Sequence, residues 1–283
     1  MAESSRIKSL SVSRIFLSGM PSQVFTNSLE HLEKLELINC NISSSSLSGL
    51  MLRLSREDSS MRELNLTNTE IGELNPTILA ECSSRLEKIC LSNVTEKQTL
   101  EIFRVLSETK ASRLKTLILE GVNDYEAWYT EGSYFSDAVT KLEKFSINFR
   151  RNQESTREHA TNIPPFLKFL FLEQSLDEIS IFNKNISLLC HPGNSTTDFT
   201  KYLKRIFFIE GKTTLNCETF AASISSLRSL SLVRTEMSVA QLSAIFEVLS
   251  KDKLSLKYLD LSENDLITVN SNQLGKEMER FFR

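Results

Sequence analysis

A three-position apolar phrase recurs along the 283-residue chain and constrains its fold more than any other feature. Each phrase has an apolar residue, two variable residues, a second apolar residue, one variable residue and a third apolar residue. The ten phrases are Val12-Ile15-Leu17, Leu32-Leu35-Leu37, Met61-Leu64-Leu66, Leu86-Ile89-Leu91, Leu114-Leu117-Leu119, Leu142-Phe145-Ile147, Leu176-Ile179-Ile181, Leu203-Ile206-Phe208, Leu227-Leu230-Leu232 and Leu256-Leu259-Leu261. Because side chains alternate along a strand, each phrase predicts a short strand with its apolar members inside.

The segments between the phrases carry helical periodicity. Apolar residues at helical spacing follow two phrases, as Leu47-Leu50-Met51-Leu54 and Leu242-Ile245-Phe246-Leu249. Capping boxes at Thr95–Gln98 and Ser238–Gln241 mark two expected helix starts, and Pro164-Pro165 marks a third. A period of about 28 residues has room for a strand and a helix, which predicts an α/β solenoid of about ten repeats. Its parallel strands would line the concave face, and its helices the convex face.

We expect one domain over residues 1–283. The middle repeats, around residues 150–211, are irregular: Leu142 and Leu176 are 34 residues apart, and polar loops fall at 150–162 and 191–198. Residues 267–283 are a candidate C-terminal cap, since terminal repeats need covering. The aromatic group near residues 125–135 is expected to pack within a convex helix, with a docking role as the alternative.

The phrases resemble the leucine-rich repeat family, specifically its long ribonuclease-inhibitor-type subclass, and are similar to the repeat region of intracellular NACHT-type immune receptors. The best match is residues 227–266, which read as one whole repeat and the start of the next. The resemblance implies a polar ladder position three residues after each phrase. Four residues there fit the role: Cys40, Thr69, Thr235 and Asn264. Arg150, Lys184 and Gly211 do not, so the resemblance predicts distorted turns in the middle repeats.

Composition restricts the compartment and the partners. The net charge is -3, so the strongest electrostatic argument for nucleic-acid binding is missing. The chain has no apolar run long enough to predict a membrane span or a secretory signal. Its five scattered cysteines favour free thiols and a cytoplasmic location. Five N-x-S/T sequons oppose that interpretation, although Asn65 falls inside an expected strand.

The sequence predicts no catalytic, cofactor-binding or metal-binding residue. Gly211-Lys212-Thr213 looks like the end of a phosphate-binding loop, but Ile206 stands where its first glycine belongs. The three histidines lie far apart, and no cysteines have zinc-site spacing.

The residues between the apolar members of each phrase form the expected binding face. Its charges are mixed, and the exposed apolar groups among them are candidate hot spots. The candidate partner-binding residues are Phe16, Cys90, Ile118, Arg205, Phe207 and Tyr258. The alternative is that the curvature of the sheet or a loop shields Ile118 and Phe207.

The favoured function is therefore a non-enzymatic module that binds a protein partner on its concave face. It would be the ligand-sensing or autoinhibitory repeat region of an innate immune sensor, or an adaptor. One alternative is a small-GTPase activator resembling the Ran GTPase-activating protein, and another is a substrate-receptor adaptor of a ubiquitin ligase. The oligomeric state stays open.

Overall fold

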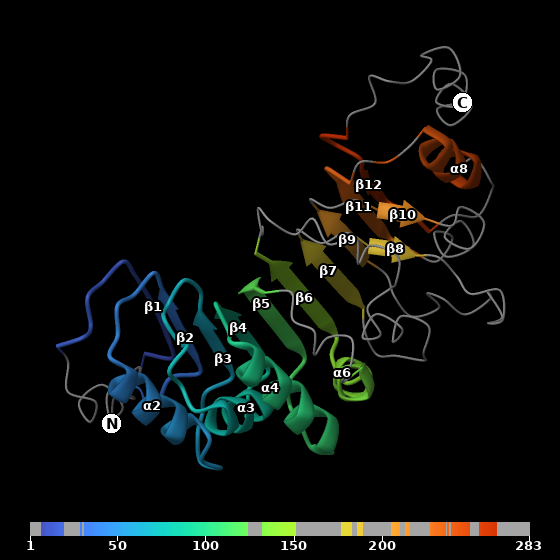
Figure 1. Ribbon diagram of the computed structural model, residues 1–283. Helices are drawn as coiled ribbons and strands as arrows, with labels where there is room; N and C mark the ends of the chain where they lie inside the picture. Colours follow the sequence, from blue (N-terminus) through green and yellow to red (C-terminus); the bar gives the residue numbers. More distant parts are fainter. Residues whose placement is uncertain are drawn as a thin grey trace, which may run out of the picture. The chain divides into compact units, whose positions relative to one another are not determined.

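A computed structural model gives the chain as two compact units, Met1–Arg150 and Arg151–Arg283, hereafter unit 1 and unit 2. The residues that it describes are 7–19, 29, 31–123, 132–150, 177–182, 186–188, 205–209, 213–215, 227–235, 237, 239–249 and 255–264. Each unit is described by itself (Figure 1). The expectation of a single domain over 1–283 stays a prediction.

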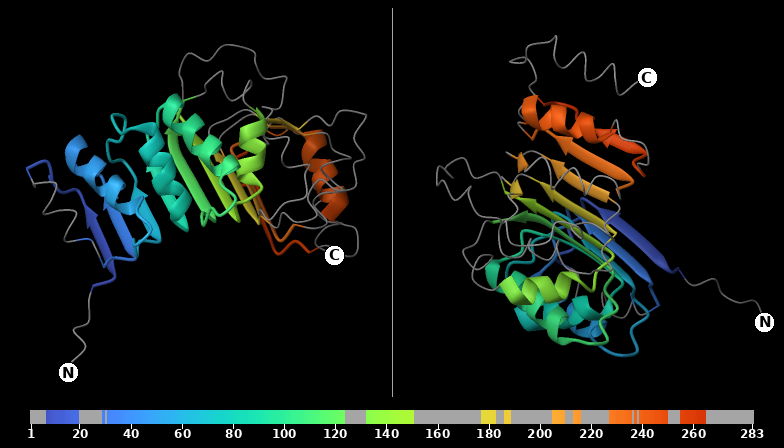
Figure 2. Two further views of the ribbon diagram at one scale, coloured as in Figure 1. Left: turned by 90° about the horizontal axis from the view of Figure 1, so that it is seen from below. Right: turned by 90° about the vertical axis from the view of Figure 1, so that its right-hand side faces the viewer.

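Unit 1 is a parallel sheet with helices on one face. Its strands are β1 (Ser9–Ser13), β2 (Lys34–Ile38), β3 (Glu63–Leu66), β4 (Lys88–Ser92), β5 (Thr116–Val122) and β6 (Lys144–Phe149), adjacent in that order. Its helices are α2 (Ser44–Leu54), α3 (Pro76–Arg85), α4 (Glu96–Glu108) and α6 (Gly132–Val139). One helix separates each pair of successive strands from β2 to β6, and all four lie on the same side of the sheet (Figure 2).

The core of unit 1 lies between the sheet and its helices. The second and third apolar members of each phrase from Leu35 to Ile147 are buried, as the alternation predicted. The helix positions Leu47, Leu50, Met51 and Leu54 are buried in α2, so that helix is confirmed. Thr95 caps α4, and its hydroxyl and the Gln98 amide bond reciprocally to the backbone.

The first phrase is wrong by five residues. Strand β1 pairs Leu10 with Leu35 and Val12 with Leu37, so the true phrase is Ile7-Leu10-Val12. The residue two places after each third apolar member has a positive φ in several repeats: Arg14, Asn39, Asn68, Asn93, Gly121, Arg234 and Glu263. Arg14 fits this left-handed turn only in the corrected register.

The polar ladder is confirmed at Cys40, Thr69 and Asn264, whereas the Thr235 hydroxyl donates to the Leu232 carbonyl of its own repeat at 3.4 Å and to Asn264 at 3.1 Å. The Cys40 thiol donates to the Val12 carbonyl at 3.5 Å, and the Thr69 hydroxyl donates to the Leu37 carbonyl at 2.7 Å. Asn264 donates to the Leu232 carbonyl and accepts from the backbone N–H of Thr235 at 2.8 Å. Cys40, Thr69 and Asn264 each join one repeat to its neighbour and satisfy a backbone group in a turn.

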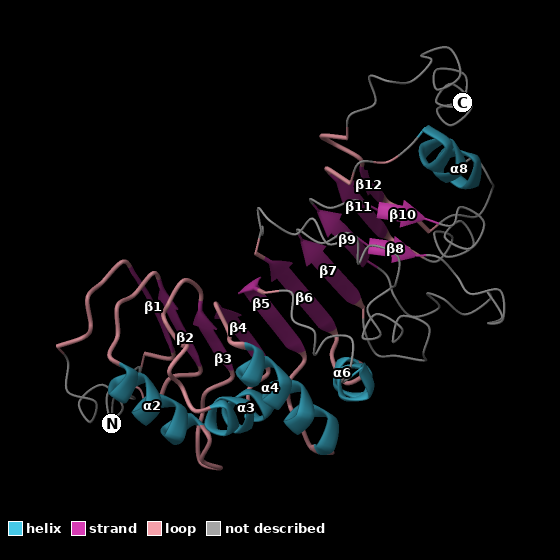
Figure 3. Cartoon of the chain, viewed as in Figure 1, coloured by secondary structure: helices cyan, strands magenta, loops and turns pink. Residues whose placement is uncertain are grey.

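Unit 2 contains four strands on the expected phrases and a small second sheet that the sequence did not predict. Strands β7 (Glu178–Phe182), β9 (Arg205–Ile209), β11 (Ser229–Val233) and β12 (Tyr258–Asp260) form a parallel sheet in that order. Two further short strands, β8 (Ile186–Leu188) and β10 (Thr213–Leu215), pair in parallel as a separate sheet (Figure 3). These strands follow β7 and β9 in the chain, in the repeats where the ladder residue is missing.

Helix α8 (Val239–Leu249) lies between β11 and β12 in the chain. It buries Leu242, Ile245, Phe246 and Leu249, which confirms the expected helix. The expected polar loops, the ladder positions Lys184 and Gly211, the helix starts at Pro164-Pro165 and Ser238, and the candidate cap at 267–283 lie outside the described residues.

Candidate functional site

The strand face is the side of each sheet whose side chains alternate with the buried core positions. In unit 1 the register aligns two columns on it. The first column is Ser9, Lys34, Glu63, Lys88, Thr116 and Lys144, and the second is Ser11, Glu36, Asn65, Cys90, Ile118 and Ser146. The register from Lys34 onward matches the sequence prediction. The columns thus place the expected binding residues Cys90 and Ile118 on adjacent strands, β4 and β5.

A third row of side chains lies just before the strands, and the sequence analysis missed it. This pre-strand row in unit 1 is Lys8, Glu33, Arg62, Glu87, Lys115 and Glu143, whose backbones are joined by successive hydrogen bonds. The charge sign alternates at every step, which was the signal available in the sequence. Ion pairs join Lys8 to Glu33 at 2.7 Å, Arg62 to Glu87 at 3.6 Å and Lys115 to Glu143 at 3.1 Å.

Ion pairs continue onto the strand face at β2 and β3. The Lys34 ammonium lies 3.0 Å from Glu36 and 3.9 Å from Glu63. The hydrogen bond from Lys34 lowers the pKa of the Glu36 carboxyl, and a hydrogen bond from Ser11 adds to this. The charges of this region therefore pair with one another, and little net charge is left to attract a partner over a distance.

Cys90 lies on the strand face but is buried, which corrects its expected exposure. It is a small side chain between Asn65 and Ile118 in the register, and the Thr67 hydroxyl lies 3.2 Å from its sulfur. Burial raises the pKa of the Cys90 thiol. A short side chain between longer neighbours on strands about 4.8 Å apart is covered by them, so Cys90 is not an accessible anchor.

The other expected residues of unit 1 differ in their exposure. Ile118 is half-buried on β5, so part of its surface faces solvent. Phe16 is 82% exposed, but it lies beyond the end of β1 and bridges to Asn41. Its predicted place in a strand column was wrong because the first phrase was wrong. Phe16 is an exposed side chain near the first strand, outside the two columns.

In unit 2, the register aligns Glu178, Arg205, Ser229 and Tyr258 in one column and Ser180, Phe207, Ser231 and Asp260 in the next. Arg205 and Phe207 therefore hold their expected positions on β9. Tyr258 is exposed, and its hydroxyl donates to Asp260 at 3.3 Å. The negative charge of Asp260 raises the pKa of the Tyr258 phenol.

Four short or acidic residues of these columns are buried, although the sequence predicted a solvent-facing surface. They are Glu178, Ser180, Ser229 and Ser231. Ser180 and Ser231 flank the position of Phe207 on the adjacent strands. The solvent-accessible part of this face is therefore narrower than its columns suggest, and Tyr258 is a prominent exposed group on it.

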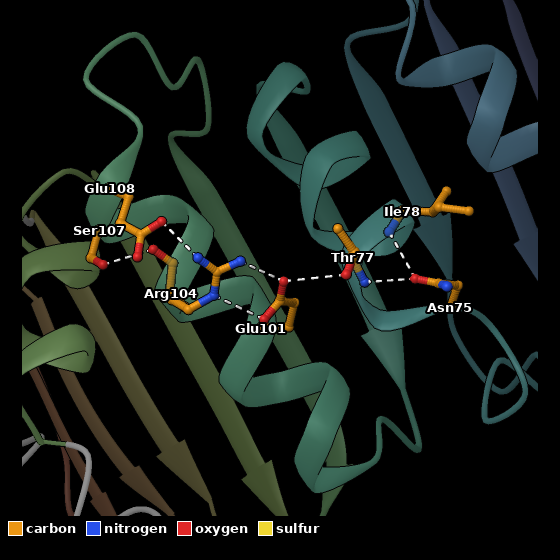
Figure 4. Close-up of polar contacts among 7 residues, drawn as sticks. All are labelled: Asn75, Thr77, Ile78, Glu101, Arg104, Ser107 and Glu108. Carbon is orange, nitrogen blue, oxygen red and sulfur yellow. Dashed lines mark hydrogen bonds and ion pairs between the residues drawn. The ribbon is translucent and has the colours of Figure 1, made fainter.

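The helix side of unit 1 carries a polar network of its own (Figure 4). Asn75 caps α3 by accepting from the backbone N–H of Thr77 at 2.9 Å. The Thr77 hydroxyl donates to Glu101 of α4 at 3.3 Å, and Arg104 bonds to Glu101 and Glu108. The hydrogen bond from Arg104 lowers the pKa of the Glu101 carboxyl. These charges already have partners within the unit.

Of the two described members of the aromatic group, Phe135 packs as expected and Tyr134 does not. Phe135 is buried in α6, and its ring centroid lies 4.4 Å from that of Phe103 in α4. Phe103 also meets Phe145 of β6 edge to face, with centroids 5.9 Å apart. Tyr134 is exposed. Tyr125, Trp128 and Tyr129 lie outside the described residues.

Three further observations concern chemistry and membranes. Within the described ranges, no group of three His, Cys, Asp or Glu side chains is placed to hold a metal ion. Thr213 begins strand β10, whereas a phosphate-binding loop leads into a helix at that point. In the part of the chain that the structure describes, no helix has the length and apolar character needed to span a membrane.

Comparisons with known proteins give a likeness in structure but none in sequence. No protein-family model and no curated protein matches the sequence. Among solved structures, an internalin from Listeria monocytogenes aligns with a TM-score of 0.47 and 16% sequence identity. The alignment covers 86% of this chain and 64% of the internalin chain, so the chain spans less than two thirds of that protein. The leucine-rich repeat interpretation of this chain rests on its own strands, register and ladder.

Proposed function

We propose that the chain is a protein-binding module that uses its strand face. The observation that carries the proposal is that each largely polar strand face has an apolar or aromatic group open to solvent, the half-buried Ile118 in unit 1 and the exposed Tyr258 in unit 2. Aromatic and aliphatic side chains surrounded by polar groups form the energetic centres of protein interfaces. The opposite face of unit 1 is covered by α2, α3, α4 and α6, whose buried residues are already packed against the sheet.

Each unit offers its own anchor, so the proposal treats the two strand faces separately. Ile118 has Thr116 as its neighbour in the first column, and both belong to β5. Tyr258 stands at the start of β12 with its hydroxyl bonded to Asp260. An anchor held by the backbone of a strand loses little conformational freedom on binding, which favours affinity.

The test is affinity capture of partners from a cell extract, followed by binding measurements with the purified partner. Ile118→Ser and Tyr258→Ser should each weaken binding by about 1 kcal/mol or more, as expected for interface anchors. The triple variant Ile118→Ser, Phe207→Ser and Tyr258→Ser should lose most of the affinity. Leu52→Ser is the matched control, because Leu52 is an exposed apolar residue on helix α2.

Circular dichroism must show that the triple variant is folded. Undiminished binding by the folded triple variant, or an equal loss with Leu52→Ser, would contradict the use of the strand face and move the site to the helices.

We also propose that the chain is not an enzyme. The support is that many charged side chains of unit 1 form ion pairs with one another, which are structural contacts. A GTP hydrolysis assay with a panel of small GTPases tests the alternative of an activator. Acceleration of hydrolysis by the wild-type chain would overturn the non-enzymatic proposal, and ubiquitin-ligase subunits among the captured partners would favour the adaptor alternative.

A finer proposal concerns the biological setting. We propose a cytoplasmic repeat region of the ribonuclease-inhibitor type, as in NACHT-type innate immune sensors. The alternation of strand and helix from β2 to β6 supports this subclass. The free, buried thiols of Cys40, Cys82 and Cys90 support a reducing compartment. The test is to express the protein in animal cells through the secretory route and to measure its glycans by mass spectrometry. A protein without glycans would agree with the cytoplasmic proposal. A glycan on Asn65 in every molecule would oppose it.

A further inference from the structure

The pre-strand row behaves differently in the two units. In unit 1, every neighbouring pair along the row has opposite charges, and three of those pairs form ion pairs. At the equivalent positions before β11 and β12 in unit 2, the neighbours are Arg228 and Lys257. Their backbones are joined by a hydrogen bond of 2.8 Å from the Lys257 N–H to the Arg228 carbonyl. The alternation of sign therefore breaks at this one described pair.

Both of these cationic side chains are exposed, and neither has an ion-pair partner within the described part of the chain. Neighbouring strands lie about 4.8 Å apart, so two like charges on adjacent positions repel each other. The same position holds a complementary carboxylate three times in unit 1. Two cations side by side with no carboxylate partner among the described residues repel each other, and an external anion would remove that cost.

The neighbours of the two cations add an aromatic group. Tyr258 follows Lys257 directly, is exposed, and holds its hydroxyl against Asp260. On the next strand, β9, Arg205 is the register partner of Ser229. An exposed ring beside two unpaired cations combines a hot-spot side chain with a charge that selects the partner.

We propose that Arg228, Lys257 and Tyr258 form a docking site for an acidic peptide segment of a partner protein. The proposal rests on the proposed function and names the chemistry of its partner. Aspartate or glutamate side chains of the segment pair with Arg228 and Lys257, and an apolar or aromatic side chain of the segment packs on Tyr258. The carboxylates take the place that Glu33, Glu87 and Glu143 occupy along the same row in unit 1.

A peptide fits this site better than a nucleic acid does. A phosphate backbone requires a stripe of many cations, whereas the described part of this edge presents two, with the Asp260 carboxylate two residues beyond Tyr258. The net charge of the whole chain is -3, which repels a polyanion at a distance. A short acidic segment carries few charges and can place them against Arg228 and Lys257 while avoiding Asp260.

The test uses the full chain and a fluorescent synthetic peptide that alternates glutamate with a few tyrosines. A peptide with lysine in place of glutamate and a single-stranded oligonucleotide of equal charge are the comparison probes. Fluorescence anisotropy should show that the acidic peptide binds and that the lysine peptide does not. Raising NaCl from about 50 mM to about 300 mM should weaken binding, because exposed charges are screened.

The decisive variant is the double reversal Arg228→Glu with Lys257→Glu, which should weaken acidic-peptide binding by about tenfold or more. Its matched control is Arg62→Glu with Lys115→Glu, which lies in the same row of unit 1 and changes the net charge equally. The control should bind the peptide within about twofold of wild type. Arg228→Lys with Lys257→Arg, which keeps both charges, should also retain binding.

Several outcomes would overturn the docking site. These are no binding of the acidic peptide, equal losses in the two double reversals, or tighter binding of the oligonucleotide than of the peptide. The strand-face function is tested independently by the Ile118 variant and its captured partner. If that partner is lost with Ile118→Ser but unaffected by the double reversal, the function stands and the acidic docking site fails.

Discussion

Unit 1 and unit 2 use the same repeated phrase but differ in how neighbouring repeats are joined. In unit 1, a helix follows each strand from β2 to β5, and the pre-strand row alternates in charge. In unit 2, β8 and β10 form a second small sheet, and Arg228 stands beside Lys257. The difference shows that the phrase determines the strand, whereas the intervening residues determine what covers it and which charges are left for a partner.

The largest expected effect tests whether the two units unfold separately. Phe103→Ala removes the ring that packs on Phe135 and Phe145 in unit 1, and should cost about 3–5 kcal/mol. Leu230→Ala in unit 2 removes a fully buried side chain and should cost about 2–5 kcal/mol. Calorimetry should show two transitions, each lowered by only one of the variants. A single transition lowered by both would show that the chain unfolds as one cooperative domain.

A smaller loss of stability tests how a buried side chain joins two repeats in unit 1. Gln98 is fully buried, and its side-chain N–H groups donate to the carbonyls of Ile71 at 2.7 Å and Leu74 at 3.0 Å, in the preceding repeat. Gln98→Ala leaves both carbonyls without that donor and should cost about 1–3 kcal/mol in chemical denaturation. Lys97→Ala is the control, since Lys97 is an exposed polar residue of the same helix. An equal loss in both variants would contradict the role of the buried Gln98 amide.

The ladder should contribute similarly in the two units, because its hydrogen bonds are equivalent. Thr69→Val removes the donor to the Leu37 carbonyl, and Asn264→Leu removes the donor to the Leu232 carbonyl. We expect a loss of about 1 kcal/mol for Thr69→Val, and a somewhat larger loss for Asn264→Leu because Asn264 also accepts from Thr235. Urea midpoints of the two variants measure this. No loss for Asn264→Leu would mean that the ladder stabilises only unit 1.

The smallest effect is a dependence on acidic pH in unit 1. Arg104 lowers the pKa of Glu101 in the folded state, so ionised Glu101 stabilises the fold at neutral pH. That contribution is lost as the pH falls through the folded-state pKa, where the carboxyl becomes protonated. Arg104→Gln should therefore lower the urea midpoint slightly at neutral pH, because an exposed ion pair contributes little, and progressively less in acid. A difference that grows as the pH falls would contradict this assignment.

The sequence by itself determined the strands that carry the apolar phrases and their register from Leu32 onward, together with helices α2, α4 and α8, but not β8 and β10. Alternation and helical spacing are local patterns, and burial follows from them directly. The same reasoning failed at the first phrase. Ile15 and Leu17 have the same spacing as the true phrase. Only the pairing of Leu10 with Leu35 and of Val12 with Leu37 shows which phrase forms the strand.

Only the tertiary structure decided which residues of the strand face are accessible. Cys90 and Ser231 occupy outward positions but are covered, while Tyr258 is exposed. Exposure depends on the sizes of side chains on adjacent strands, which are 24 to 34 residues apart for the phrases after Met61 and therefore not neighbours in the sequence. The pairing of Lys115 with Glu143 and the placement of Arg228 beside Lys257 have the same origin. An ion pair needs two charges within a few ångströms, and only the folded chain sets that distance.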